Sequence, residues 1–291
     1  MEDHVIRATA PGLRAFAAVT TNLTDEARRR HNCYPVAAAA LGRTMTAALL
    51  LATNLKADES ITVRISGDGP LGEIIADATA RGSVRGYVKN PQIDLPLQEG
   101  KLDVGKAVGA GNIFVTRFTG LKRPFTGSAP LVSGEIAEDV TNYLLTSEQT
   151  PSSVALGVLV GPDYTVQAAG GFLVQALPGA ADEVIDKLEQ NLASLRPVSH
   201  LIKAGYGAAD ILEKIFTGLS INLYEPKKLT FHCPCSRERV ERVLINLGEQ
   251  ELTDMIKEGQ AELVCHFCNE KYFFNSQELA AILQHIKQGA T

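Results

Sequence analysis

The chain has 291 residues, of which 45% are hydrophobic and 21% are charged, and its formal net charge is −5. This composition is close to that of globular proteins and excludes a chain that is disordered or fibrous as a whole. A mildly acidic protein has no electrostatic attraction to polyanions, so we expect neither nucleic acid nor a membrane as a partner. At about 100–200 residues per domain, the length predicts about two domains.

The start of the chain and its longest apolar stretch both favour a cytoplasmic protein. Residues 1–4 are acidic and lead into no apolar run, unlike a secretory signal peptide. The apolar stretch 36–55 contains Arg43 and Asn54, and a charge inside a membrane span costs at least about 2.5 kcal/mol. We therefore expect a buried helix at this place in the chain.

Residues 1–180 are predicted to form an α+β domain in which helices pack on antiparallel sheets. Segment 28–55 has helical character and is broken at Pro35, and 136–145 is a second predicted helix. Short strands separated by turn residues at this spacing are typical of antiparallel sheets. The strands predicted from apolar runs and alternation are 61–65, 73–78, 83–88, 113–118, 154–160 and 172–177.

Residues 181–231 are predicted to form a metastable helical linker. Apolar residues recur at helical spacing over 185–195, where we expect Asp182 as the N-cap, and again over 211–216. Helices this short are marginal alone and need a tertiary surface. The linker must therefore dock on another part of the chain, and such a segment opens at low free-energy cost.

Residues 232–291 are predicted to form a small C-terminal module. Its expected elements are a helix over 237–247, a short helix around 252–256, a hairpin of 262–265 with 271–274, and a last helix capped by Ser276. An apolar core is usually too small to stabilise a domain of this size, so we expect a metal to hold it together.

The strongest motif consists of two cysteine pairs in this module. Cys233 and Cys235 form a C-x-C pair, and after a gap of 29 residues Cys265 and Cys268 form a C-x-x-C pair. Four thiolates from two segments can surround zinc tetrahedrally at about 2.3 Å, and structural zinc contributes roughly 10–16 kcal/mol. The histidines at 232 and 266 adjoin the cysteines, but four thiolates already fill a tetrahedral site.

The first cysteine pair also suggests redox chemistry. Cys235 precedes a predicted helix start and lies beside Arg237 and Arg239. A helix N-terminus and nearby cations favour the thiolate, which is the form that oxidants attack. Both pairs are close enough in sequence to form local disulfides. Structural zinc, redox-labile zinc and metal-free dithiol catalysis all remain open at this point.

Other motifs point to structure. Gly67, Gly69 and Gly72 match the dinucleotide-binding pattern as a string, but a predicted strand follows them, so we expect a hairpin turn. Cys33 stands alone in a helical region and is interpreted as a small core residue. The spacing of the remaining residues identifies no Ser/His/Asp set or carboxylate pair, and the six scattered histidines leave a catalytic site open at this point.

The cysteine pairs and their neighbours resemble a known family. The sequences Cys233 to Arg239 and Cys265 to Cys268 are similar to those of the redox-regulated chaperone family called heat-shock protein 33. The likeness extends over nearly the whole chain, and Cys33 is outside the pattern and is given no role. Further matching motifs are 67–70, 109–111, 147–149 with Pro151, and 169–171 running to Pro178.

The resemblance implies an ATP-independent holdase with a redox switch. In that family the reduced form binds one zinc ion per chain and is inactive, and oxidants convert each cysteine pair to a disulfide. Zinc then leaves, the linker unfolds, and the protein binds unfolding or oxidatively damaged clients, often as a homodimer. On this chain the resemblance implies that the zinc ligands are the four cysteines Cys233, Cys235, Cys265 and Cys268. It also implies that oxidation forms the redox-active disulfides Cys233–Cys235 and Cys265–Cys268.

Two rival functions remain from other classes. A zinc ribbon that docks on nucleic acid needs a basic face, but residues 232–291 hold six Lys and Arg against nine Asp and Glu. A thiol oxidoreductase would instead turn over disulfide substrates with Cys265 and Cys268.

Overall fold

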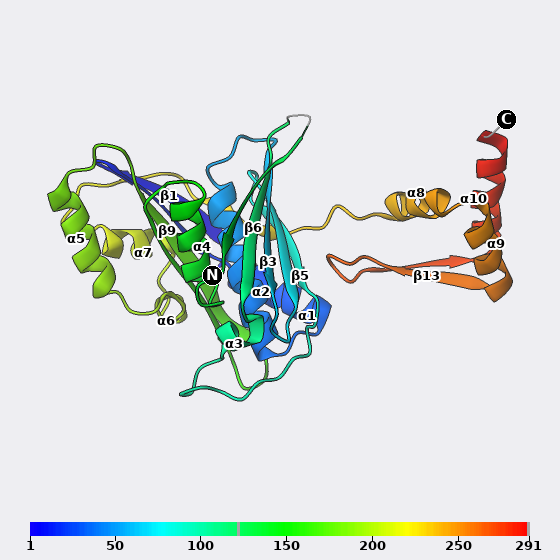
Figure 1. The fold of residues 1–291 in the computed structure, drawn as a ribbon, viewed down its shortest axis with the longest axis horizontal. Coiled ribbons are helices and arrows are strands. Elements are labelled where there is room, and N and C mark those ends of the chain that lie inside the picture. The colour runs from blue at the N-terminus through cyan, green and yellow to red at the C-terminus, as the bar shows by residue number, and fades with distance from the viewer. Residues whose placement is uncertain (121–122, 290–291) are drawn as a thin grey trace. The chain divides into compact units, whose positions relative to one another are not determined.

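The computed structural model describes residues 1–120 and 123–289. The chain divides into two compact units, Met1–His232 and Cys233–Thr291 (Figure 1). The architecture is α+β, as the sequence predicts. The boundary between the units falls after residue 232, and a separate linker domain over 181–231 stays a prediction.

The first unit contains two sheets of six strands each. Sheet A consists of β1 (His4–Ala10), β2 (Leu13–Val19), β8 (Ser152–Val160), β9 (Val166–Ala176), β10 (Asn222–Leu223) and β11 (Lys227–Lys228). Sheet B consists of β3 (Ser60–Gly67), β4 (Glu73–Thr79), β5 (Ser83–Val88), β6 (Gly111–Phe118), β7 (Phe125–Pro130) and β12 (Thr230–Phe231). The order is β10-β1-β2-β9-β8 in sheet A, with β11 also on β1, and β12-β5-β4-β3-β6-β7 in sheet B. Pairing is antiparallel except between β12 and β5.

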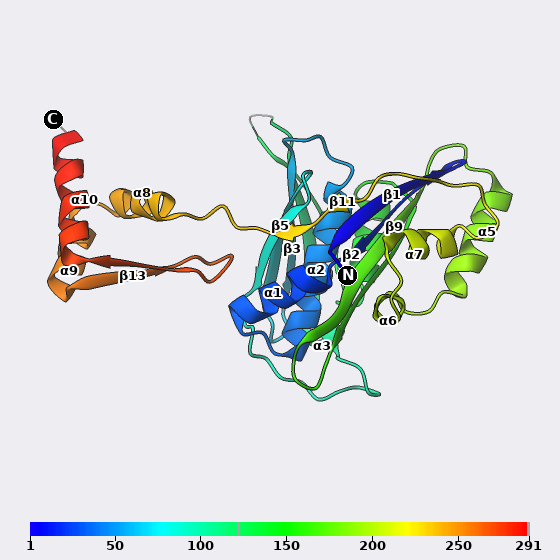
Figure 2. The same ribbon diagram turned by 180° about the vertical axis from the view of Figure 1, so that it is seen from behind.

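A buried helix fills the space between the two sheets. Helix α2 (Pro35–Ala52) begins with proline at its first position, where the missing N–H costs nothing. Among the described residues it is the helix long and apolar enough to cross a membrane, and 89% of its residues are buried inside the protein. Figure 2 shows this helix running between the two sheets. The prediction of a buried helix is therefore confirmed. The shorter helices α3 (Val104–Val108) and α4 (Ala137–Thr146) also belong to this unit.

The glycine motifs allow two loops to pack closely. The turn between β3 and β4 lies against the loop before β6, where the Asp68 carboxylate accepts a hydrogen bond of 2.7 Å from the Ala110 N–H. A Cβ atom at Gly67 would lie 1.9 Å from the Val108 carbonyl oxygen. Only glycine permits this close approach. Because β3 and β4 pair antiparallel on either side of the glycines, the motif forms a hairpin turn, as predicted, and not a nucleotide loop.

The beginning of the first unit departs from the prediction. Two helices replace the single broken one, because α1 (Thr21–His31) starts well before residue 28. Its first turn is capped by the residue just before β1, because the Asp3 carboxylate accepts from the Asn22 and Leu23 N–H groups at 3.0 and 2.6 Å. Strands β1 and β2 were not predicted, since β2 is buried on both faces and lacks alternation.

The linker segment docks on the outer face of sheet A. It contains α5 (Asp182–Ala193), α6 (Val198–Lys203) and α7 (Ala208–Ile215), of which α6 was not predicted. Ala181 is the N-cap of α5, so the expectation that Asp182 caps this helix is wrong. The linker side chains buried against sheet A are Leu188, Val198, Leu201, Ile202, Ala208, Ile211, Leu212, Ile215 and Phe216.

Polar contacts hold the ends of α7. The Asn191 side chain donates hydrogen bonds of 2.9 Å to the carbonyls of Ile215, the last residue of the helix, and of Thr217, two residues beyond it. At the other end, the His4 Nε2 atom accepts from the Ala208 N–H at 3.3 Å. Strands β10, β11 and β12 follow, and they tie residues 222–231 first to β1 and then to β5. Each of these strands has two residues.

The second unit contains the elements predicted for it. These are α8 (Arg237–Leu247), α9 (Glu249–Glu258), the hairpin of β13 (Gln260–Val264) with β14 (Lys271–Asn275), and α10 (Ser276–Gly289). The predicted cap of the last helix is wrong by one residue, because Asn275 Oδ1 accepts from the Gln277 and Glu278 N–H groups at 3.0 Å. The Ser276 hydroxyl donates instead to the Gly259 carbonyl at 2.7 Å.

Candidate metal and redox centre

Four cysteine sulfurs come together in the second unit. Cys233 and Cys235 lie in the segment that leads into α8, and Cys265 and Cys268 lie in the loop between β13 and β14. All four Sγ atoms lie within 4.8 Å of one another. The Cys233–Cys265 sulfurs are 3.7 Å apart, and the Cys235–Cys268 sulfurs are 3.3 Å apart.

These spacings fit a tetrahedral metal ion. Sulfur ligands at about 2.3 Å from a tetrahedral centre lie about 3.8 Å from one another. The observed sulfur separations are close to this value, so the four cysteines could hold one metal ion. The four are also the only group of metal-ligating side chains found among the described residues.

Local hydrogen bonds fix the two loops. In the hairpin loop, the Cys265 N–H donates to the Glu270 carbonyl at 2.8 Å, and the Asn269 N–H donates to the Cys265 carbonyl at 2.8 Å. Asn269 has a φ of 59°, which lets the loop turn sharply back toward β14. In the other segment, the Ser236 hydroxyl caps α8 by accepting from the Arg239 N–H. Hydrogen bonds of the backbone therefore hold each cysteine pair next to the end of a regular element, the first pair before α8 and the second pair between β13 and β14.

The arginines beside Cys235 are directed elsewhere. Arg239 donates to the Pro234 carbonyl at 2.8 Å, and Arg237 donates to the Phe273 carbonyl at 2.9 Å and to Glu278 at 2.7 Å. Burial raises the pKa of the Cys235 thiol, so the free thiol differs from the sequence-based expectation of a favoured thiolate. A bound cation reverses this preference, because it takes thiolates as its ligands.

Burial also sets the properties of the other cysteines. Cys268 is buried, and this burial raises the pKa of its thiol. Cys33 lies in the core of the first unit with 2% exposure, and burial raises the pKa of its thiol to about 12. The interpretation of Cys33 as a core residue is confirmed. His232 lies at the end of β12, where its N–H donates to the Val84 carbonyl, and neither it nor His266 belongs to the sulfur group.

One side chain at the centre was missed by the sequence reasoning. The Tyr272 hydroxyl donates a hydrogen bond of 3.2 Å to the Cys235 sulfur, although the two residues are 37 positions apart. The pairing of β13 with β14 places Tyr272 opposite Leu263. The strand pattern of 271–274 predicts the hairpin, but the residue contacted by its tyrosine depends on how the two loops meet.

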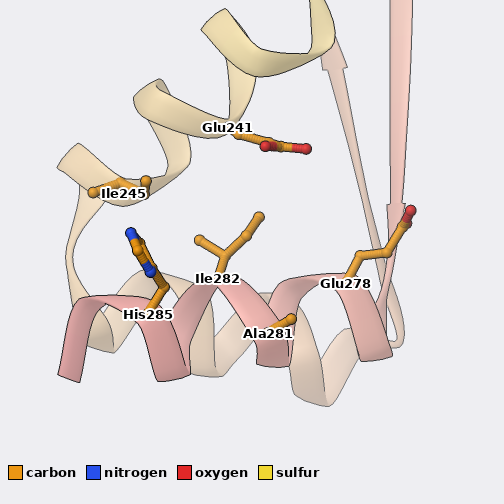
Figure 3. A pocket seen from close by; sticks show the side chains of 6 residues that line it. All are labelled: Glu241, Ile245, Glu278, Ala281, Ile282 and His285. Atoms are coloured by element: carbon orange, nitrogen blue, oxygen red, sulfur yellow. The ribbon is translucent and has the colours of Figure 1, made fainter. Parts of the chain in front are cut away.

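A groove of about 320 Å³ lies between α8 and α10. The residues that line it are Glu241, Ile245, Glu278, Ala281, Ile282 and His285 (Figure 3). Arg237 approaches Glu241 at 3.8 Å and pairs with Glu278 at 2.7 Å. Because these carboxylates share a cation and stand over apolar side chains, the groove is typical of helix packing and carries no metal-ligand set.

Fold and centre together define a class of protein: an α+β core followed by a small module that is built around four cysteines able to hold a metal ion. The model of the family described as Hsp33 protein matches residues 3–275. The chain belongs to the Hsp33 family of chaperones, and the resemblance seen in the sequence is confirmed.

The chain is similar to several named proteins over almost its full length. The 33 kDa chaperonin of Desulforamulus reducens is 53% identical, with 99% of each chain covered. The 33 kDa chaperonin of Bacillus subtilis is 51% identical, over 96% of this chain and 98% of the relative. The crystal structure of the 33 kDa chaperonin from Thermotoga maritima superposes with a TM-score of 0.90 at 37% identity, covering 98% and 99% of the two chains.

Proposed function

We propose that this chaperone is an ATP-independent holdase that is inactive while reduced and zinc-bound, and that oxidation activates it. The observation that carries the proposal is the gathering of four cysteine sulfurs at tetrahedral spacing. They lie in a unit whose core, among the described side chains, is a cluster of five buried apolar residues, Leu244, Leu252, Ala261, Phe274 and Leu279. A module of this size depends on its metal, so chemistry at the sulfurs acts on its folding.

Cys233, Cys235, Cys265 and Cys268 are the proposed zinc ligands, one ion per chain. Bound zinc supplies a positive charge that holds four thiolates together and joins the two segments that carry them. The donor set supports zinc among the metals, because four thiolates in tetrahedral array suit it well. The backbone around the hairpin loop keeps Cys265 and Cys268 in place for this role.

Oxidation by a peroxide removes the ligands in pairs. A cysteine thiolate attacks one peroxide oxygen, the O–O bond breaks, and the sulfur becomes a sulfenic acid while hydroxide leaves. The second thiolate of the pair then attacks that sulfur, forms the S–S bond and expels a second hydroxide. Each disulfide thus passes two electrons from two thiolates to one peroxide. The proposed pairs are Cys233–Cys235 and Cys265–Cys268.

The linker is the element that this event would release. Cys233 follows β12 by two residues, and β12 is a strand of two residues that hold the chain on β5. Loss of structure at the cysteines therefore removes order from a segment whose own attachment is weak. Once 181–231 separates from sheet A, the apolar side chains of α7, such as Ile211, Leu212 and Phe216, become available to unfolding clients.

The same proposal assigns the remaining properties. We infer a cytoplasmic protein that acts on unfolding or oxidatively damaged clients, is active as a homodimer, catalyses no reaction, and uses neither nucleic acid nor membrane as a partner. The acidic balance of residues 232–291 supports the exclusion of nucleic acid.

Light scattering from a thermally unfolding client tests the proposal. We expect the zinc-loaded, reduced protein to leave aggregation unchanged, and the peroxide-treated protein to suppress it while zinc is released. Suppression in both states would mean that the zinc is only structural. Equal hydrogen-exchange protection of residues 181–231 before and after peroxide would contradict the proposed release of the linker.

A further inference from the structure

Tyr272 connects the hairpin of the second unit to the other cysteine pair. Its hydroxyl lies 3.2 Å from the Cys235 sulfur and is the donor, since a thiolate can only accept. Tyr272 lies on β14, four positions after Cys268, whereas Cys235 lies in the segment before α8. The hydrogen bond therefore crosses between the two segments that supply the sulfurs.

We propose that Tyr272 is a positioning residue that orients the Cys235 thiolate and slows its oxidation. This inference rests on the proposed zinc-thiolate centre and adds a residue to it. A hydrogen bond from a neutral hydroxyl to an ionised sulfur is charge-assisted and stronger than one between neutral groups. Groups that hydrogen-bond to metal ligands fix their direction and tune their electronic properties.

The protection follows from the electron pair that oxidation uses. A sulfur lone pair must attack the peroxide oxygen when the O–O bond breaks and the sulfenic acid forms. The Tyr272 hydroxyl engages electron density on that sulfur and stabilises the ground state of the thiolate. The attack therefore has a higher barrier at Cys235 than it has without the hydroxyl. Tyr272 itself is neither oxidised nor consumed.

The contribution of the Tyr272 hydroxyl can be tested separately from that of its ring. Its ring is half-buried within the hairpin, among the side chains that pack against the core of the second unit. The Tyr272→Phe variant keeps the ring and removes only the donor. Ser276→Ala is a matched control, because it also removes one hydroxyl hydrogen bond from this unit, the 2.7 Å contact with the Gly259 carbonyl, without touching a sulfur.

The first experiment measures oxidation of each cysteine in the full-length, zinc-loaded protein. Hydrogen peroxide is added, the reaction is quenched at intervals, and peptide mass spectrometry quantifies the modification of each cysteine. A hydrogen bond to a charged group contributes enough that its loss should accelerate the Cys235 reaction about tenfold in Tyr272→Phe. Ser276→Ala should react at the wild-type rate. Acceleration of all four cysteines alike, or of none, would overturn the inference.

The second experiment reads the sulfur directly. Cobalt(II) in place of zinc gives a sulfur-to-metal charge-transfer band in the near ultraviolet. Loss of the hydrogen bond should move the band of Tyr272→Phe to lower energy, because the sulfur electrons are less stabilised, and Ser276→Ala should leave the band in place. A protein with 4-aminophenylalanine at position 272 retains a donor and should recover part of both effects. An unmoved band in Tyr272→Phe would contradict the inference.

Zinc content separates the two levels of the hypothesis. If the wild-type protein binds no zinc through its cysteines, both the proposed function and the inference about Tyr272 are contradicted. Wild-type protein that binds zinc and releases it on oxidation, with Tyr272→Phe unchanged in rate and spectrum, would overturn the role of Tyr272 alone.

Discussion

The two units of this chaperone are stabilised by different means. The first unit buries its core between two sheets, a central helix and the linker helices, with large side chains such as Phe16, Leu49 and Tyr143 almost completely enclosed. The second unit encloses few apolar side chains, and its four cysteines stand at the junction of its two loops. Burial is sufficient for a large unit, whereas a small one needs an added link between its segments.

This difference determines where an oxidant can act. The Cys33 thiol is sealed in the large core with a raised pKa, so it offers little thiolate for attack. The sulfurs of Cys233, Cys235 and Cys265 are only partly buried. An oxidant can therefore reach these three sulfurs more readily than it can reach Cys33.

Removal of the metal should have the largest effect. The Cys265→Ser variant, or a zinc chelator, takes away a contribution of roughly 10–16 kcal/mol, which is the typical binding energy of structural zinc. We expect residues 233–289 to lose hydrogen-exchange protection while the two sheets keep theirs. Cys33→Ala is the control and should retain one zinc per chain. A folded second unit without metal would contradict the comparison.

A core substitution in the first unit should give the opposite pattern. Phe16→Ala removes a ring with 1% exposure, and such changes cost about 3–5 kcal/mol. Urea unfolding should show this loss, with zinc content unchanged. Phe125→Ala removes the same side chain from a position with 65% exposure, and its effect should stay within about 0.5 kcal/mol. Equal losses in the two variants would show that burial is not the source of stability.

The linker should respond to a loss of packing without any oxidant. Ile211→Ala leaves a cavity where α7 meets sheet A, at a cost of about 2–5 kcal/mol to the docked state. We expect faster hydrogen exchange over 181–216 and partial suppression of client aggregation by the reduced protein. Glu213→Ala, on the exposed side of the same helix, should change neither measurement. Unchanged hydrogen exchange in Ile211→Ala would contradict the proposal that undocking of the linker activates the protein.

The smallest effect concerns the cap of the last helix. Asn275→Ala removes the acceptor for two N–H groups at the start of α10, and it should destabilise the zinc-loaded second unit by about 1 kcal/mol. Thermal unfolding of the zinc-loaded protein measures the loss, with the exposed Gln277→Ala as its control. An equal loss in the control would show that the cap is not its source, because alanine has the higher helix propensity and should not destabilise the helix at this exposed position.

The sequence by itself determined the elements that depend on neighbouring residues. The helices and hairpin of the second unit, the strands β3, β4, β5 and β6 of sheet B and the two cysteine pairs all follow from local periodicity, turn residues and short spacings. The cysteine spacing also indicated a shared metal, because a tetrahedral site needs four ligands and the module needs a link.

Tertiary structure alone decided the contacts between residues far apart in the chain. The cap of α1 comes from Asp3, the short strands 222–231 depend on the edges of β1 and β5, and Cys235 receives its hydrogen bond from Tyr272. Strands β1 and β2 lack alternation because sheet A is covered on both faces. Local patterns record which face of an element is apolar, but partners are chosen only when distant segments meet, since hydrogen bonds and packing act over a few ångströms in space.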